Sequence, residues 1–393
     1  MNAFQFNTTK SIICEPGSLK RIEEFCSAYG VKRPVVITDN GIVACGLLDQ
    51  LKDAISVTSL VPDYFLEVVA DPPEEVVLAA IEFAKQHNAD GVIGFGGGSS
   101  MDTAKLVAAV LCSGQSLQSM YGVDQVQGGR LPLILVPTTA GTGSEVTPIS
   151  IVTTGETTKA GIVSSILLPD IALLDAELTL GLPSSVTAAT GIDAMVHAIE
   201  AYTSAIKKNP YSDMLACKAL GLLTDNIAKA TYDGKDIEAR QNMLLGACLA
   251  GQAFANAPVA AVHALAYPLG GHFHIPHGLS NSLVLPHVMN FNKSACAELY
   301  VELVPYIAPD LPPYLSRTGG PEAEVNALIK HIEGLIKALG LPTSLAEMGI
   351  EESQLEALAD DAMLQTRLLM NNPREVARSD ALAIYQAAYN GIA

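Results

Sequence analysis

Hydrophobic residues follow two different patterns in the first half of the chain. Short apolar runs at 33–39, 90–95 and 131–137 are bounded by polar or turn residues, and they predict strands buried on both faces. Between them, 18–29 and 73–87 are amphipathic, with apolar residues at the i, i+3, i+4 spacing of a helix. Strands that alternate with helices in this way indicate a parallel sheet, so we predict an α/β domain.

The α/β part ends with a predicted hairpin, and the second half of the chain reads differently. Runs rich in β-branched residues at 146–154 and 160–168 flank a polar turn and predict a hairpin. After Pro183, which suits the first turn of a helix, the sequence is rich in Ala and Leu with helical periodicity, and strand signals nearly vanish. We therefore predict two domains, an α/β domain at 1–182 and an all-α domain at 183–393.

Composition narrows the class of protein. Of the 393 residues, 49% are hydrophobic and 16% charged, which is typical of a folded enzyme of two or three domains. A net charge of -18 argues against nucleic acid and anionic membranes as partners, because their phosphates would be repelled. The first residues lack the apolar core of a signal peptide, and no apolar run reaches the ~18 residues that span a bilayer.

Two smaller sequence features complete this description. The seven cysteines are scattered and form no CxxC pair, which fits reduced thiols, so we expect a cytoplasmic protein. A Pro/Gly-rich stretch at 310–323 predicts a loop within the helical half.

A glycine-rich turn, Gly96–Ser100 (GGGSS), follows the apolar run 90–95 and precedes an apolar helical stretch. Glycines at such a place let the backbone approach a pyrophosphate, and the helix N-terminus offers free N–H groups to it. The alternative is a tight strand–helix turn without a ligand. It stays open because the motif is not GxGxxG and does not follow the first strand.

Three further features point to the same kind of cofactor. Asp39 ends the strand 33–39, where a carboxylate can accept from both ribose hydroxyls and repel a 2′-phosphate, which favours NAD over NADP. A helix cap is the alternative role for Asp39. The small, polar run 137–145 after another strand suits contacts with phosphate or ribose, and Lys159 could reach the same groups unless it is a solvated surface lysine.

The histidines are clustered. Five of the eight fall between His263 and His287, a density that points to a metal or proton-transfer site. Asp193 and His197 are four residues apart in a predicted helix, so both side chains lie on one face. With His263 and His277 they would supply three imidazoles and one carboxylate, a set that suits Fe²⁺ or Zn²⁺ with room for a substrate oxygen.

Other polar and aromatic residues surround these candidate ligands in the sequence. Tyr267 lies four residues after His263 and could hydrogen-bond a substrate oxygen or relay a proton, or it could be an amphipathic core tyrosine. His272 and His274 are candidates for lining a substrate pocket, with surface histidines as the alternative.

These features together resemble the iron-containing (group III) alcohol dehydrogenase family over essentially the whole chain. The most specific matches are GGGSSMDTAK at 96–105, PTTAGTGSEVT at 137–147, GIDAMVHAIEAY at 191–202 and the run 263–281. The resemblance implies an N-terminal Rossmann-like dinucleotide-binding domain, an all-α metal-binding C-terminal domain, NAD and Fe²⁺ as cofactors with Zn²⁺ as a substitute, and a homo-oligomer.

The resemblance also implies roles for single residues. The metal ligands would be Asp193, His197, His263 and His277, and Phe254 would match a substrate-pocket phenylalanine. Asp71 stands where many members have an asparagine near the cofactor. The implied cofactor contacts are Asp39, Asp71, Gly97, Gly98, Ser99, Asp102, Thr138, Thr139, Thr142, Ser144 and Lys159.

We predict that the protein transfers hydride between NAD and a small primary alcohol or aldehyde, with Tyr267, His263 and His277 in catalytic positions. Many alcohol-oxidising members carry a second histidine where this chain has Tyr267, so a 4-hydroxybutyrate-type ω-hydroxy acid or semialdehyde is an alternative substrate. A dehydroquinate-synthase-like lyase is a more remote alternative, because no basic residue lies beside a predicted ligand in sequence. A third alternative is a protein without catalytic activity that a bound metal stabilises.

Overall fold

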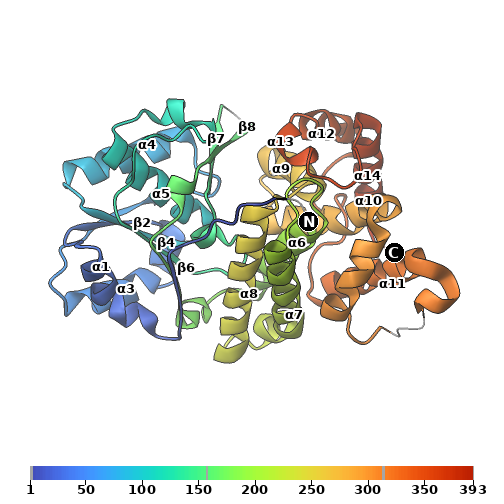
Figure 1. The fold of residues 1–393 in the computed structure, drawn as a ribbon, viewed down its shortest axis with the longest axis horizontal. Coiled ribbons are helices and arrows are strands. Elements are labelled where there is room, and N and C mark those ends of the chain that lie inside the picture. The colour runs from blue at the N-terminus through green and yellow to red at the C-terminus, as the bar shows by residue number, and fades with distance from the viewer. Residues whose placement is uncertain (1–2, 156–157, 312–314, 393) are drawn as a thin grey trace. The chain divides into compact units, whose positions relative to one another are not determined.

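The computed structural model describes residues 3–155, 158–311 and 315–392 (Figure 1). It contains two compact units. The sheet unit consists of Asn7–Leu182 and Gly234–Gly251. The helical unit consists of Met1–Phe6, Pro183–Asp233 and Gln252–Ala393.

The predicted domains, 1–182 and 183–393, stay a prediction, because compactness alone does not establish that a unit folds independently. One segment also differs from the predicted boundary: Gly234–Gly251 belongs to the sheet unit, whereas the prediction places it in the all-α domain. This segment includes most of α8 (Ile237–Asn256).

The described part of the sheet unit is built on a six-stranded sheet in the order β1-β9-β6-β4-β2-β3. Its strands are β1 (Ser11–Cys14), β2 (Pro34–Asp39), β3 (Asp63–Val68), β4 (Gly91–Gly96), β6 (Leu133–Pro137) and β9 (Ile171–Leu174). All of these pairings are parallel. The predicted parallel α/β sheet is therefore confirmed, and the three apolar runs are β2, β4 and β6.

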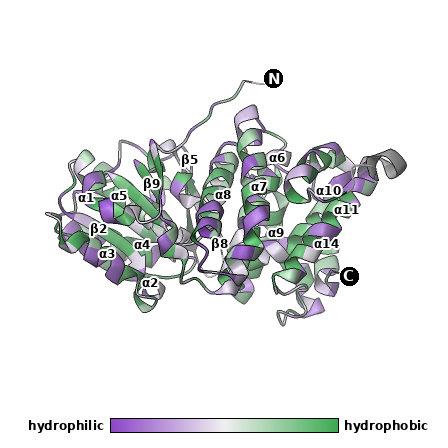
Figure 2. Ribbon diagram, turned by 90° about the horizontal axis from the view of Figure 1, so that it is seen from below, coloured by the Kyte–Doolittle hydropathy of each residue, from purple (hydrophilic) through white to green (hydrophobic). Residues whose placement is uncertain are grey.

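Helices cover both faces of this sheet (Figure 1). The helices are α1 (Ile22–Ala28), α2 (Asn40–Ala44), α3 (Leu47–Ser56), α4 (Glu74–Gln86) and α5 (Gly98–Ser113). Because successive strand residues point to opposite faces, Leu133 and Leu135 pack with α4 and α5, whereas Ile134 and Val136 pack with α1 and α3. Burial on both sides explains why the strands are continuous apolar runs, which Figure 2 shows in green along β2.

A second, smaller sheet contains the predicted hairpin. Its order is β5-β8-β7, formed by β5 (Gly122–Val123), β7 (Ile149–Thr154) and β8 (Thr158–Val163). β7 and β8 pair antiparallel, with Thr153 opposite Lys159, so the hairpin is confirmed. The predicted helix at 18–29 is divided into a 3₁₀ turn, Ser18–Arg21, and α1.

The described residues of the helical unit contain helices and no strand. The helices are α6 (Ser184–Thr203), α7 (Pro210–Tyr232), α9 (Ala261–Phe273), α10 (His277–Ile307), α11 (Leu315–Ala338), α12 (Leu355–Ala362), α13 (Thr366–Leu369) and α14 (Arg378–Asn390). α6 packs against α7 and α10 and is buried along nearly its whole length. Such a helix can present polar side chains only to the interior of the unit.

The predicted loop at 310–323 is partly wrong. α11 already begins at Leu315, while 312–314 lie outside the described residues. Gly320 takes a left-handed φ of 70° that bends the chain, and Pro321 then suits the first turn of the resumed helix. The Gly and Pro residues thus interrupt a helix instead of excluding one.

In the described residues, no single helix has both the length and the apolar character to cross a membrane. One bent pair, α8 with α9, meets that test of length and composition when the two helices are taken together.

Candidate functional site

One face of α6 carries three ionisable side chains on successive turns. Asp193, His197 and Glu200 follow the i, i+4, i+7 spacing, so their side chains are stacked. The small residues around them let neighbouring helices approach, and the three are only 1%, 4% and 4% exposed. Buried ionisable groups need partners, so this face predicts a cluster.

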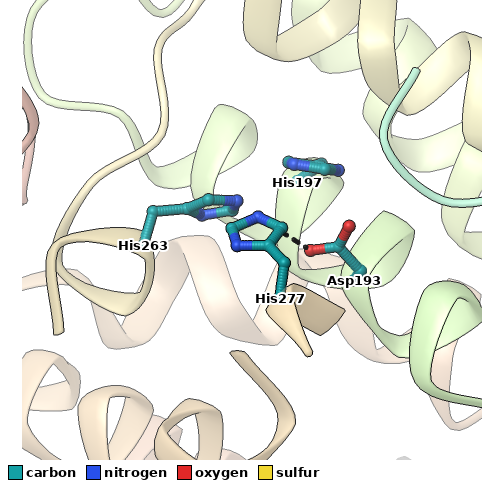
Figure 3. A group of neighbouring side chains, drawn as sticks. All are labelled: Asp193, His197, His263 and His277. Atoms are coloured by element: carbon teal, nitrogen blue, oxygen red, sulfur yellow. Dashed lines mark ion pairs between the residues drawn. The ribbon is translucent and has the colours of Figure 1, made fainter. Parts of the chain in front are cut away.

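His263 and His277 complete this cluster from two other helices (Figure 3). His263 lies in the first turn of α9, and His277 is the first residue of α10. Gly278 lets α10 begin close to α6, because a Cβ at this position would lie 2.5 Å from the Ala189 carbonyl oxygen. This close approach brings His277 Nε2 to 3.6 Å from Asp193 Oδ1.

The cluster fits a metal ion. Asp193, His197, His263 and His277 each offer one ligand atom, and these atoms all lie within 4.8 Å of one another. Ligands at about 2.0–2.2 Å from one ion can be at most about 4.4 Å apart, so only small movements are needed. Three imidazoles and one carboxylate suit Fe²⁺ or Zn²⁺. The side chain of His277 is 29% exposed, so the cluster is accessible on that side.

Two polar residues outside this set contact the candidate ligands. Glu200 Oε2 accepts a hydrogen bond from His263 Nδ1 at 2.6 Å. Asn281 Nδ2 donates to Asp193 Oδ1, also at 2.6 Å. Burial alone would raise the pKa of Asp193, but the positive potential of the three histidines, led by His197, and this hydrogen bond hold it below its usual range.

From the sequence alone, neither of these two residues was assigned a role. Glu200 could have been found, because it extends the Asp193/His197 stripe by one more turn of the same helix face. Asn281 ended a run that was singled out, but nothing in the sequence indicated that its amide meets Asp193.

Aromatic residues border the cluster. The Phe254 ring stacks on His197 with centroids 4.4 Å apart and planes at 21°. Tyr267, one turn after His263 on α9, has its ring 6.0 Å from that of His277. Both aromatic side chains predicted near the substrate therefore lie beside candidate ligands.

The other two predicted pocket histidines lie at the end of α9. His272 is exposed and pairs with Asp361 of α12. His274 is exposed and takes a left-handed φ of 54° as the C-cap. Both match the surface alternative, and their role in a pocket stays a prediction.

In the sheet unit, the topology brings the predicted cofactor segments together. The strands β6, β4 and β2 are neighbours, and all are parallel, so the segments that follow them share one edge of the sheet. Asp39 ends β2, the GGGSS turn follows β4, and the run from Thr138 follows β6. Ligands of open α/β sheets bind at this carboxyl edge.

The glycine-rich turn has room for a ligand. Gly97 is the N-cap of α5 and supplies no side-chain cap, so the first N–H groups of this helix are open to an anion. A Cβ at Gly97 would meet nothing nearer than Thr139 Oγ1 at 3.8 Å, whereas one at Gly98 would approach Thr142 to 3.0 Å. Gly98 thus brings the two predicted cofactor turns into contact, and the space beside Gly97 suits a pyrophosphate.

A buried lysine joins these two turns. Lys105 is fully buried, and its Nζ donates to Asp102 Oδ1 at 3.0 Å, Ser144 Oγ at 2.7 Å and the Ile149 carbonyl at 2.6 Å. Ser144 Oγ also donates to Asp102 Oδ1 at 2.6 Å. The predicted cofactor residues Asp102 and Ser144 therefore have internal partners. Burial lowers the pKa of Lys105, but the Asp102 carboxylate partly offsets this effect.

The remaining predicted cofactor residues lie around the same turns. Asp39 caps α2 by accepting from the Ile42 N–H, which was the alternative role, and it also accepts from Ser100 Oγ at 3.0 Å. Asp71 pairs with Lys159 at 2.7 Å. Its backbone N–H donates to Ser99 Oγ at 3.3 Å, so this pair lies beside the glycine-rich turn.

The combination defines a class of protein. A parallel α/β sheet with a glycine-rich turn at its carboxyl edge is a dinucleotide-binding fold, and a buried cluster of three histidines and one aspartate is a metal centre. The two features together are those of a metal-dependent protein that uses a nicotinamide cofactor, the class to which the metal-dependent oxidoreductases belong.

Comparison with known proteins specifies the family. Residues 9–176 match the model of the iron-containing alcohol dehydrogenases, and 187–389 match the C-terminal model of the same family. A long-chain-alcohol dehydrogenase of Geobacillus thermodenitrificans (strain NG80-2) is 41% identical over 95% of this chain and 94% of its own. The chain belongs to the iron-containing alcohol dehydrogenase family.

Solved structures agree with this assignment. A 1,3-propanediol oxidoreductase matches with a TM-score of 0.93 at 30% identity, covering 99% of this chain and 100% of its own. A sulfoacetaldehyde reductase from Bifidobacterium kashiwanohense, solved with NAD⁺, has a TM-score of 0.86 at 29% identity over 98% of both chains.

These findings confirm the predicted fold class, the family and the general activity, an NAD-dependent alcohol dehydrogenase of the iron type. NAD and iron as cofactors are likewise confirmed, with Zn²⁺ as a substitute that the ligand set permits. The comparisons favour neither the lyase nor the non-catalytic alternative.

Proposed function

We propose that the protein interconverts a small primary alcohol and its aldehyde, with iron held by Asp193, His197, His263 and His277. The observation that carries this proposal is the convergence of four ligand atoms within 4.8 Å from three separate helices. The burial of Asp193, His197 and His263 supports a preorganised centre, because side chains held by packing need little rearrangement to bind an ion.

A divalent iron bound there would supply Lewis-acid chemistry, lowering the pKa of an alcohol hydroxyl and polarising an aldehyde carbonyl. Asp193, His197, His263 and His277 would hold the ion, and the first three of these side chains are buried. NAD⁺, when bound, would supply the acceptor for the hydride that leaves the alcohol carbon on oxidation, with one proton released. Reduction of an aldehyde would be the reverse reaction.

Tyr267 and Phe254 are proposed to act on the substrate. The phenol of Tyr267 is near His277 and would hydrogen-bond the substrate oxygen or pass on the proton. Phe254, stacked on His197, would provide an apolar surface for the carbon chain. His263 and His277 take part as ligands, and His272 and His274 would line the approach to the centre.

The cofactor contacts divide by the chemistry of each group. Gly97, Gly98 and Ser99 would bind the pyrophosphate through backbone N–H groups. Asp39 would accept from the adenosine ribose. The remaining proposed contacts, on the nicotinamide side and around the turns, are Asp71, Asp102, Thr138, Thr139, Thr142, Ser144 and Lys159.

The substrate class is proposed from the aromatic surroundings of the metal centre. Phe254 provides an apolar surface, which suits an uncharged, small alcohol better than a 4-hydroxybutyrate-type acid, because the acid would need a cation for its carboxylate. The relatives include a long-chain-alcohol dehydrogenase, a 1,3-propanediol oxidoreductase and a sulfoacetaldehyde reductase. A panel of short alcohols, long alcohols, diols and ω-hydroxy acids, ranked by kcat/KM, decides among them.

We also propose that the protein is a cytoplasmic homo-oligomer. Seven cysteines without a disulfide support a reducing compartment. The oligomer follows from the family resemblance alone, and light scattering coupled to size-exclusion chromatography measures it directly.

The central experiment is metal removal and replacement. Chelation should abolish NAD-linked alcohol oxidation, and Fe²⁺ should restore it. His263→Ala should lower kcat/KM by about three orders of magnitude or more, because a Lewis acid contributes several kcal/mol to transition-state stabilisation. Full turnover by the metal-free protein or by this variant would exclude the mechanism.

A further inference from the structure

Glu200 lies one turn beyond His197 on the ligand-bearing face of α6 and is 4% exposed. We propose that Glu200 is a positioning residue that fixes the tautomer of His263 so that Nε2 can bind the metal. This inference rests on the proposed metal-dependent function and deepens it, because it assigns the group that prepares one ligand.

Both carboxylate oxygens of Glu200 accept hydrogen bonds. Oε1 accepts from the backbone N–H of Val262 at 2.7 Å, and Oε2 accepts from His263 Nδ1 at 2.6 Å. A carboxylate can only accept, so the proton of a neutral His263 must be on Nδ1. The lone pair is then on Nε2, the nitrogen that lies 3.3 Å from Asn281 Nδ2 and faces the ligand cluster. A carboxylate behind a metal-binding histidine has this orienting effect in other metal sites.

The same carboxylate also stabilises the start of α9. Ala260, the N-cap of α9, makes no side-chain capping hydrogen bond. The Val262 N–H is one of the first N–H groups of this helix, which have no partner within it, and Glu200 Oε1 accepts from it. A carboxylate near a helix N-terminus is favourable as well. Glu200 therefore combines two separable roles, a helix cap through Oε1 and an orienting contact through Oε2.

Glutamine separates these roles because it has nearly the same shape but only one acceptor oxygen. In Glu200→Gln the amide oxygen can still accept a hydrogen bond from the Val262 N–H. The amide NH₂ group then faces His263 Nδ1. Nδ1 must then accept, the proton moves to Nε2, and the lone pair needed by the metal is lost. A second variant, Glu200→Met, removes both acceptors and leaves the tautomer of His263 unconstrained.

The test measures metal affinity instead of turnover. Co²⁺ is titrated into metal-free protein in competition with a chelator, and the visible absorption of the bound Co²⁺ reports its coordination. We expect the dissociation constant of Glu200→Gln to rise by about ten- to a hundredfold. The melting temperature of its metal-free form should stay close to that of the wild type, because the cap is kept.

Glu302→Gln is the matched control. Glu302 on α10 accepts from the Tyr202 hydroxyl of α6 and is not one of the four candidate ligands, so this variant should bind Co²⁺ as the wild type does. Wild-type affinity and absorption in both Glu200 variants would overturn the positioning role. Failure of the wild-type protein to bind one Co²⁺ per chain would instead contradict the proposed function, so the two failures are distinguishable.

Discussion

The two candidate sites are built in opposite ways. In the helical unit, Asp193, His197 and His263 are buried with their ligand atoms facing one another. In the sheet unit, Asp102 and Ser144 make internal hydrogen bonds, and the space proposed for the pyrophosphate is beside Gly97, which has no side chain. The metal centre thus depends on side chains, whereas the dinucleotide site depends on backbone groups and on the residues that hold the turns.

This difference follows from the ligands. A metal ion needs strong donors in a fixed geometry, which side chains supply. A pyrophosphate needs several N–H groups and a close approach of the backbone, which glycines and a helix N-terminus supply. Substitutions should therefore affect the two sites in different ways.

The largest effect is expected from Lys105→Met in the sheet unit. Removing this buried ammonium leaves Asp102 and Ser144 without a shared donor, which should lower the free energy of unfolding by about 3–5 kcal/mol and weaken NAD binding. Urea unfolding and calorimetric titration with NAD measure the two effects. Lys20→Met is the control: the side chains of Lys20 and its partner Glu177 are 77% and 44% exposed, so the stability loss should be about 1 kcal/mol or less and NAD binding should be unchanged.

A smaller effect is expected from Gly278→Ala at the metal centre. The new Cβ would meet the Ala189 carbonyl oxygen at 2.5 Å, so the start of α10 must move and take His277 with it. Metal affinity should fall by about tenfold or more while NAD binding is retained. Gly334→Ala in α11 has nothing within 4 Å and should leave metal affinity unchanged. Equal metal binding by both variants would show that the approach of α10 does not matter.

Gly97→Ala should affect the cofactor alone. Gly97 has an ordinary φ of -82°, and its Cβ would meet nothing nearer than 3.8 Å, so stability should change by less than about 0.5 kcal/mol. NAD affinity should nevertheless fall by about tenfold, because the methyl group occupies the space proposed for the pyrophosphate. Thermal unfolding measures the stability, and NAD titration measures the affinity. Unchanged NAD affinity would contradict the proposal that the pyrophosphate binds beside Gly97.

The two units should also differ in the pH dependence of stability, with opposite signs. Burial raises the pKa of Glu145 in the sheet unit from 4.5 to about 7. The folded protein therefore holds this proton more tightly than the unfolded chain does, and stability is lost as the pH rises from about 4.5 through 7. Glu145→Gln should flatten this loss in urea unfolding series.

In the helical unit, burial lowers the pKa of His287 from 6.5 to about 4. The unfolded chain binds this proton more readily, so stability is present above pH 6.5 and is lost as the pH falls through about 4. The two pH windows overlap, so the two groups are distinguished by the sign of the slope: His287→Gln should reduce the loss of stability as the pH falls, and Glu145→Gln the loss as it rises. If either substitution changed the slope with the opposite sign, the assignment of that group would be wrong.

Much of the fold could be predicted from local patterns. The apolar runs that became β2, β4 and β6 were recognisable because strands buried on both faces carry no polar alternation. The Asp193/His197 pair was recognisable because a spacing of four residues has a fixed meaning on a helix. The interrupted start of α11 was not recognisable, because Gly and Pro indicate a break in a helix but not whether the helix continues after it.

The sequence by itself determined the parallel sheet, the helical second half, the family and the four candidate ligands, because each leaves a local periodicity or a motif. Only the tertiary structure decided that Glu200 meets His263 and that Lys105 joins Asp102 to Ser144. It also decided that Gly278 must be small to pass Ala189. These contacts join residues far apart in the chain, and packing of whole helices and turns, which no local pattern encodes, brings them together.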